Sequence, residues 1–198
     1  MSDMKDNLLA AGRWRDASAV LQRNLPAAMQ DWLFDAGSLT LRLQQACADR
    51  ADGGFAVRVL SQQRRRPLRD ERQLLAMPEY EFALVRQVQL LCMGRPWVFA
   101  RTVVPLRSLV GRGRRLACLG NRPLGAMLFA DKSVCRSRLQ IARLTAGDEV
   151  FSSAIKGLTL VPDEIWGRRS LFHYAGRPLL VNEIFLPDVG CYHARQAA

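Results

Sequence analysis

Three arginines and one glutamate are the residues of this chain best suited to chemistry. Arg86 and Arg101 recur 82 positions later as Arg168 and Glu183, each within a similar apolar stretch. Guanidinium groups bind carboxylate oxygens in pairs and stay charged at any working pH. A lone carboxylate among them can accept a hydrogen bond from a hydroxyl group. These residue types therefore favour a small ligand that carries two carboxylates and a hydroxyl group.

The two stretches that carry these residues are predicted to be β-hairpins. Residues 84–105 and 167–187 each contain two apolar runs joined by Gly-Arg-Pro, where Gly permits a tight turn and Pro interrupts a ladder. A turn of two or four residues in the first hairpin places Arg86 opposite Val103. We therefore expect Arg86 and Arg101 to point from the same face of the sheet.

The segments that precede the hairpins also repeat. Residues 32–34 and 42–44 are echoed by residues 127–129 and 138–140 at a nearly constant offset. We interpret this pattern as an internal duplication of a helix plus a hairpin, which predicts a helix over residues 133–144. The alternative is that two amphipathic hairpins merely share Gly, Pro and apolar residues. If the chain is duplicated, both hairpins join one sheet and their charged side chains converge.

Length and composition favour a single globular domain. The chain has 198 residues, of which 49% are hydrophobic, and no stretch long and apolar enough for a signal peptide or a membrane span. We therefore expect a cytoplasmic protein. The chain has two histidines and five cysteines without CxxC spacing, which favours reduced cysteines and chemistry without a metal or cofactor. The cysteines are Cys47, Cys92, Cys118, Cys135 and Cys191.

The formal charge of +11 fits an anionic partner. Arginines cluster in residues 64–72 and 107–115, and such runs are most often solvated loops. The chain lacks a helix-turn-helix pattern, a zinc finger and an RNA-binding aromatic motif, so we expect no nucleic-acid partner. Transient contact with an acidic membrane surface is left open, and we expect a monomer.

Two further helices are predicted near the hairpins. Residues 25–34 place apolar side chains on one helical stripe, and Ser38 can cap a second helix that contains Leu39. The run from Gly120 to Gly125 is a break that delivers Leu124 as an apolar plug before another helix. Such helices could cover one face of the sheet.

The stretches LVRQVQLLCMGRPWVFARTVVP, RPLG and WGRRSLFHYAGRPLLVNEIFLP strongly resemble the chorismate pyruvate-lyase family, which makes 4-hydroxybenzoate for ubiquinone. The resemblance covers residues 25–187, between a lead-in of residues 1–24 and a tail of residues 188–198. It implies a single α+β domain with a six-stranded antiparallel sheet and helical flaps over the ligand on one face. The stretch between Leu144 and Trp166 looks longer than in relatives.

The resemblance also implies a set of site residues. Its substrate-contacting positions fall on Leu39, Arg86, Leu124 and Glu183, and Arg101 matches a further active-site arginine. By our hypothesis Arg86 holds the ring carboxylate of chorismate, Arg101 stabilises the departing enolpyruvyl group and Glu183 orients the hydroxyl. Leu39 and Leu124 then close over the ring and exclude water. The alternative for Arg101 and Glu183 is that they pair with each other.

Arg168 and the overall activity each have a second interpretation. The repeat gives Arg168 a ligand role, whereas its neighbourhood beside Trp166 favours a structural role, either capping a helix end or stacking on an aromatic ring. For the protein as a whole, the alternative is a non-catalytic effector-binding domain of the kind found in transcription regulators. The short lead-in leaves no room for a DNA-binding module.

Overall fold

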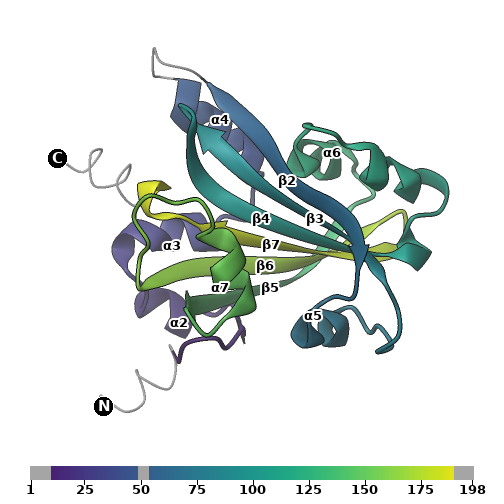
Figure 1. Cartoon of the computed structure of the whole chain (residues 1–198), viewed down its shortest axis with the longest axis horizontal. Coiled ribbons are helices and arrows are strands. Elements are labelled where there is room, and N and C mark those ends of the chain that lie inside the picture. Colours follow the sequence, from purple (N-terminus) through teal and green to yellow (C-terminus); the bar gives the residue numbers. More distant parts are fainter. Residues whose placement is uncertain (1–9, 49–53, 190–198) are drawn as a thin grey trace.

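The computed structural model describes residues 10–48 and 54–189, and within these ranges seven strands form one antiparallel sheet (Figure 1). The sheet thus has one strand more than the six that were expected. Residues Arg15–Asp16, in the lead-in, add an edge strand by pairing with β5. The order is β1-β5-β6-β7-β4-β3-β2, with β1 Arg15–Asp16, β2 Phe55–Arg65, β3 Ala83–Cys92, β4 Arg95–Pro105, β5 Cys135–Thr145, β6 Glu164–Tyr174 and β7 Arg177–Phe185.

The sheet consists of two similar halves that meet at its centre. Strands β2, β3 and β4 form one meander and β5, β6 and β7 the other, and the two are joined by pairing between β4 and β7. In that ladder Ala100 pairs with Glu183 and Arg101 pairs with Asn182. In the two meanders Arg86 pairs with Thr102 and Arg168 pairs with Glu183, so Thr102 and Glu183 hold corresponding places. An internal duplication would produce this correspondence.

Helices cover both faces of the sheet, whereas flaps over one face were expected. On the face that carries Arg86 lie α3, α4 and α6. On the opposite face lie α5 and α7, which pack on the sheet through Leu75 and Phe151 respectively. The long stretch after Leu144 supplies α7. The helices are α2 Ala19–Arg23, α3 Ala27–Phe34, α4 Leu39–Ala48, α5 Arg69–Leu74, α6 Leu124–Ala130 and α7 Glu149–Ala154, with 3-10 turns η1 Leu106–Ser108 and η2 Gly111–Cys118.

The predicted helix over residues 133–144 is wrong. Cys135–Thr145 is strand β5, which pairs along its length with β6 and carries buried residues such as Ile141 on one side. The prediction arose because residues 138–140 were aligned with residues 42–44, which are part of α4. The true counterpart of α4 is α6, since each is followed by three strands of one meander.

The predicted register of the first hairpin is also wrong, by one residue. A bulge lies where Leu90 pairs with Val98 but Leu91 pairs with Pro96, which leaves Trp97 as the additional residue on β4. Beyond the bulge Arg86 pairs with Thr102 and not with Val103. Because side chains alternate along a strand, a shift of one residue moves every β4 side chain to the other face.

The expectation that all cysteines are reduced is contradicted by a disulfide between Cys47 and Cys92. The bond joins the end of α4 to the end of β3, across a sequence separation of 45 residues. Only the packing of α4 on the sheet brings these residues together, so spacing in the sequence could not reveal the pair. Cys118 and Cys135 are free and exposed, and Cys191 lies outside the described residues.

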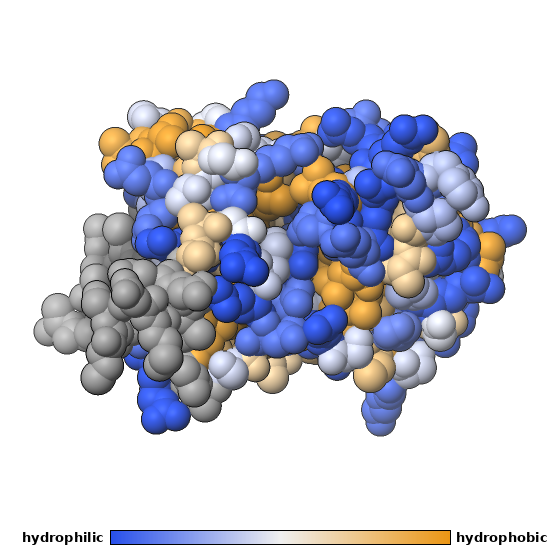
Figure 2. Space-filling view, turned by 90° about the horizontal axis from the view of Figure 1, so that it is seen from below, coloured by the Kyte–Doolittle hydropathy of each residue, from blue (hydrophilic) through white to orange (hydrophobic). Residues whose placement is uncertain are grey.

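The surface seen in Figure 2 is dominated by hydrophilic residues, with small apolar patches between them. None of the described helices is both long and apolar enough to cross a membrane.

Candidate active site

A partly enclosed pocket lies between the sheet and the first turns of α4 and α6. It leaves about 40 Å³ for the centres of water-sized molecules. A single water needs roughly 10–15 Å³ on this measure, so the pocket holds a few waters as it stands. Its walls are mainly apolar. The lining residues are Leu39, Thr40, Val57, Arg86, Val88, Leu90, Ala100, Thr102, Pro123, Leu124, Gly125, Leu128, Phe129, Phe172, Val181 and Glu183.

Arg86 supplies the positive charge of this pocket. Its side chain is only 3% exposed, and one terminal nitrogen donates to the carbonyl oxygens of Gly120 at 2.9 Å and Arg122 at 3.3 Å. Its buried Nε–H has no hydrogen-bond partner, and the described residues place no carboxylate within ion-pair distance. Burial lowers the pKa of Arg86 from its ordinary value, which reflects the cost of keeping this cation out of water.

Glu183 supplies the negative charge from β7. Its Oε2 accepts a hydrogen bond from Nε of Arg168 at 2.5 Å, and its side chain retains 18% of its exposure. Arg168, by contrast, is 1% exposed and does not line the pocket. Arg168 therefore fixes one carboxylate oxygen of Glu183, and this contact also sets the orientation of the other oxygen.

Arg86 and Glu183 stand on the same face, one on either side of β4. Arg86 pairs with Thr102 and Glu183 pairs with Ala100, two residues further along β4. With strands about 4.8 Å apart and a rise of about 3.3 Å per residue, the two Cα atoms are roughly 12 Å apart. The pocket therefore offers a donor and an acceptor at its two ends, which suits an elongated ligand with polar groups at opposite ends.

Arg101 lies on the opposite face of the sheet from this pocket. Its Nε and Nη2 donate to the two carboxylate oxygens of Glu71, at 2.8 and 2.9 Å, and both side chains are almost fully buried. Asn182 adds a hydrogen bond to the same carboxylate. The expectation that Arg86 and Arg101 share a face is wrong because of the bulge at Trp97. Arg101 also does not pair with Glu183, whose partner is Arg168.

The helices α4 and α6 cover the pocket and approach each other closely at Thr40 and Gly125. Leu39 is the first residue of α4 and Leu124 the first of α6, and both line the pocket as buried residues. Next to them, a Cβ atom on Gly125 would meet Oγ1 of Thr40 at 2.6 Å. Only glycine permits this approach, so the roof of the pocket depends on Gly125.

Several lining residues were not predicted from the sequence. Phe129 and Phe172 meet edge to face, with ring centroids 6.3 Å apart, and form an aromatic wall beside Leu128. Thr102 was missed because of the register error. The sequence placed Phe172 in a hairpin but offered no signal that its strand faces α6. Among the residues that the structure describes, no three His, Cys, Asp or Glu side chains are grouped to hold a metal ion.

The fold and the pocket together define a single α+β domain with a pocket on one face of its sheet, and solved structures share this fold. A gene product of Staphylococcus aureus superposes with a TM-score of 0.51 and 10% identity, over 77% of this chain and 90% of its own. A GntR-family transcriptional regulator from Bacillus cereus has a TM-score of 0.50 and 9% identity, over 68% and 92%. At such low identity the likeness concerns the fold alone.

Sequence comparison gives the family. Residues 8–195 match the family model for chorismate lyase. A probable chorismate pyruvate-lyase from Methylococcus capsulatus is 47% identical, over 81% of this chain and 96% of its own length. Another from an Azoarcus species is 42% identical, over 81% and 85%. The chain belongs to the chorismate lyase family.

The buried pair on the far face predicts a large loss of stability when it is broken. Replacing Arg101 with Met leaves the carboxylate of Glu71 buried without its main partner, so we expect the free energy of unfolding to fall by about 3–5 kcal/mol. Denaturant unfolding followed by circular dichroism measures this change.

Two further variants sharpen that test. The exposed pair of Arg138 with Asp16 makes Arg138→Met a matched control that should leave stability nearly unchanged. Adding Glu71→Met to Arg101→Met should recover part of the loss, because no buried charge is then left alone. A single Arg101→Met variant as stable as the control would contradict this assignment.

Proposed function

We propose that this protein converts chorismate to 4-hydroxybenzoate and pyruvate. Membership of the chorismate lyase family supports the substrate and the reaction. The observation that carries the proposal at the level of residues is Arg86, a buried cation that lines the pocket and has no carboxylate partner among the described residues. Such a cation is costly unless a ligand supplies the missing negative charge.

The proposed binding mode uses the two ends of the pocket. Chorismate has a ring carboxylate and, across the ring, a hydroxyl group. Arg86 binds the ring carboxylate, and Glu183 accepts a hydrogen bond from the hydroxyl. The separation of roughly 12 Å between their Cα atoms leaves room for the ring between the two side chains. The same placement favours the product in which hydroxyl and carboxylate lie opposite each other.

The bond changes take place within the substrate. The hydrogen on the carbon that bears the hydroxyl passes to the methylene of the enolpyruvyl group, which becomes the methyl of pyruvate. The ether bond to the ring breaks, and its electrons form the ketone of pyruvate. The electrons of the C–H bond complete the aromatic ring. Catalysis of this step requires the protein to position the substrate and to stabilise developing charge, and it requires no strong base.

Leu39 and Leu124 close the pocket during this reaction. Their apolar side chains exclude water and hold the enolpyruvyl group near the hydrogen that it accepts. Because the pocket in its closed form holds only a few waters, substrate entry requires the first turns of α4 and α6 to move apart. Arg101 has no part in this scheme, since its side chain lies on the other face.

The product enters ubiquinone synthesis, as the resemblance of the two hairpins implies, and we propose that the reaction takes place in the cytoplasm. We also propose a transient contact with acidic membrane surfaces through four exposed arginines. A hydrogen bond from Gln62 to the carbonyl of Ala117 holds η2 beside β2, and these two elements carry the four arginines; they are Arg64, Arg65, Arg114 and Arg115. Sedimentation with anionic vesicles should retain the protein at low salt and release it at high salt. Equal sedimentation with neutral vesicles would contradict the contact.

A non-catalytic effector-binding domain is the alternative, because regulators share the fold. Turnover separates the two activities. A domain that only senses its ligand would bind 4-hydroxybenzoate and form no product from chorismate.

The Arg86→Ala variant tests the proposed function most simply. Without the guanidinium the ring carboxylate has no partner, so turnover of chorismate should fall roughly 100-fold or more, the factor that about 3 kcal/mol represents. The measurement follows 4-hydroxybenzoate and pyruvate without added metal or nucleotide. Arg58→Ala is the matched control, since Arg58 lies on neighbouring β2, is exposed and points to Gln89 on the other face. No wild-type product above the spontaneous rate rejects the function, and unchanged turnover in Arg86→Ala removes Arg86 from the site.

The roof of the pocket is tested by Gly125→Ala. The added methyl group collides with Thr40, so the two helices cannot approach as closely and the closed state is disfavoured. We expect 4-hydroxybenzoate to bind about tenfold more weakly and to dissociate faster, by stopped-flow fluorescence. The double variant Gly125→Ala with Thr40→Gly should restore much of the affinity. A Gly125→Ala protein with wild-type release kinetics would show that the helix contact does not hold the product.

A further inference from the structure

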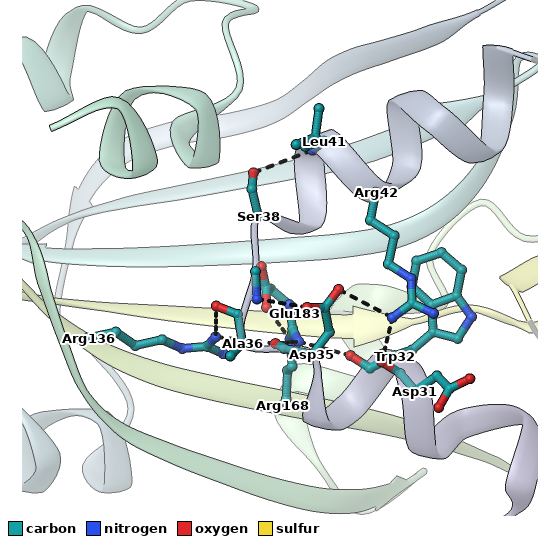
Figure 3. A network of polar contacts seen from close by, with 11 residues as sticks. Asp31, Trp32, Asp35, Ala36, Ser38, Leu41, Arg42, Arg136, Arg168 and Glu183 are labelled. Carbon is teal, nitrogen blue, oxygen red and sulfur yellow. Dashed lines mark hydrogen bonds and ion pairs between the residues drawn. The ribbon is translucent and has the colours of Figure 1, made fainter. Parts of the chain in front are cut away.

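Buried and half-buried arginines gather around the end of α3, at the connection to α4 (Figure 3). Nη1 of Arg168 donates to the carbonyl oxygens of Trp32 at 2.9 Å and Asp35 at 2.6 Å. Nη1 of Arg136 donates to the carbonyl oxygens of Asp35 and Ala36, both at 3.3 Å. The last carbonyls of a helix have no partners within the helix, so these side chains supply them.

The connection is fixed from its solvent side as well. Arg42, on the first turn of α4, donates to the carbonyl of Asp31 and to the carboxylate of Asp35, at 2.5 and 3.2 Å. Its guanidinium also lies over the ring of Trp32, 4.1 Å from the centroid. Residues 35–38 are thus held on one side by Arg42 and on the other by Arg136 and Arg168.

Arg168 joins this connection to the pocket. The guanidinium that holds the carbonyls of Trp32 and Asp35 also donates from Nε to Glu183. Residues 36–38 lead directly from Asp35 to Leu39, which lies over the pocket. The rigid, planar guanidinium of Arg168 therefore contacts a pocket carboxylate at one edge and the α3–α4 connection at the other.

Arg136 supports Arg168 from strand β5. Its Nε donates to Oγ of Ser170 at 2.8 Å, which fixes the guanidinium beside that of Arg168. Burial lowers the pKa of Arg136, and the neighbouring positive charge of Arg168 lowers it further. A buried cation beside a half-buried one is costly, and the carbonyls of the connection together with Glu183 offset part of that cost. The arrangement is therefore sensitive to any change at Glu183.

We propose that Arg168 and Arg136 are positioning residues that couple Glu183 to the flap formed by the first turn of α4. A ligand hydroxyl on Glu183 holds the carboxylate in place against Arg168. Arg168 then holds the α3–α4 connection, and the connection keeps Leu39 over the ring. The coupling deepens the proposed function, on which its ligand rests, but the contacts themselves exist without a ligand.

Amide hydrogen exchange in the ligand-free protein tests this coupling. Arg168→Lys and Arg136→Lys keep the charges but lose the planar fork, so the amides of residues 36–43 should exchange about tenfold faster. Arg138→Lys is the matched control on the same strand as Arg136, and it should leave these amides unchanged because its partner is Asp16 at the surface. Glu183 contacts Arg168 and makes none of the hydrogen bonds described above to residues 36–43. Glu183→Gln should nevertheless raise the exchange rate of these amides about threefold, because it weakens the hold on Arg168.

The outcomes separate this coupling from the proposed function. Unchanged exchange at residues 36–43 in Glu183→Gln overturns the coupling, and so does an acceleration in Arg138→Lys equal to that in Arg136→Lys. A merely structural role lowers the melting temperature of Arg168→Lys and leaves these amides no faster than others. Chorismate turnover of the wild type is measured in parallel. If turnover is absent while the exchange pattern appears, the coupling stands and the proposed function fails.

Discussion

The candidate site depends on the burial of one cation, Arg86, that no carboxylate among the described residues neutralises. Two carbonyl oxygens accept hydrogen bonds from it, but carbonyls supply only partial charge, and its buried Nε–H has no partner among these residues. Placing a guanidinium in an apolar chamber costs stability, which the large cores on both faces of the sheet offset. In our proposal a ligand carboxylate recovers part of that cost when it binds. Affinity for an anion would then be built into the protein before the ligand arrives.

The extra residue in β4 shows how two similar halves of the sheet come to serve different purposes. Arg86 pairs with Thr102 and Arg168 pairs with Glu183, so Thr102 is the counterpart of Glu183 in the fold. Arg101, 82 residues before Glu183, is displaced by the bulge at Trp97 to the far face, where it pairs with Glu71. One half thus supplies a pocket carboxylate and the other a buried ion pair that ties α5 to the sheet. Equal spacing in the sequence did not imply an equal place in the fold.

The sequence predicted the parts of the fold that follow from local chemistry and missed those that follow from packing. The Gly-Arg-Pro turns identified both hairpins, and the apolar stripe identified α3. The bulge at Trp97 has no local signature, and it reversed the face of Arg101. The disulfide of Cys47 depends on how α4 packs against β3. Strand β5 was misassigned because the duplication was aligned by one element too few, with α3 matched to α6 and α4 matched to β5. The pocket brings together four of the expected residues, namely Leu39, Arg86, Leu124 and Glu183. These four came from the family resemblance, which did not depend on the predicted hairpin register.

The central claim is that the Arg86 guanidinium recognises the carboxylate of the ligand. A direct measurement compares 4-hydroxybenzoate with 4-hydroxybenzamide by calorimetry, on the wild type and on Arg86→Met. Wild-type protein should prefer the carboxylate by roughly 100-fold, because a charged bidentate contact is replaced by a neutral one, and Arg86→Met should bind the two compounds almost equally. The same preference for the carboxylate in both proteins would contradict the account.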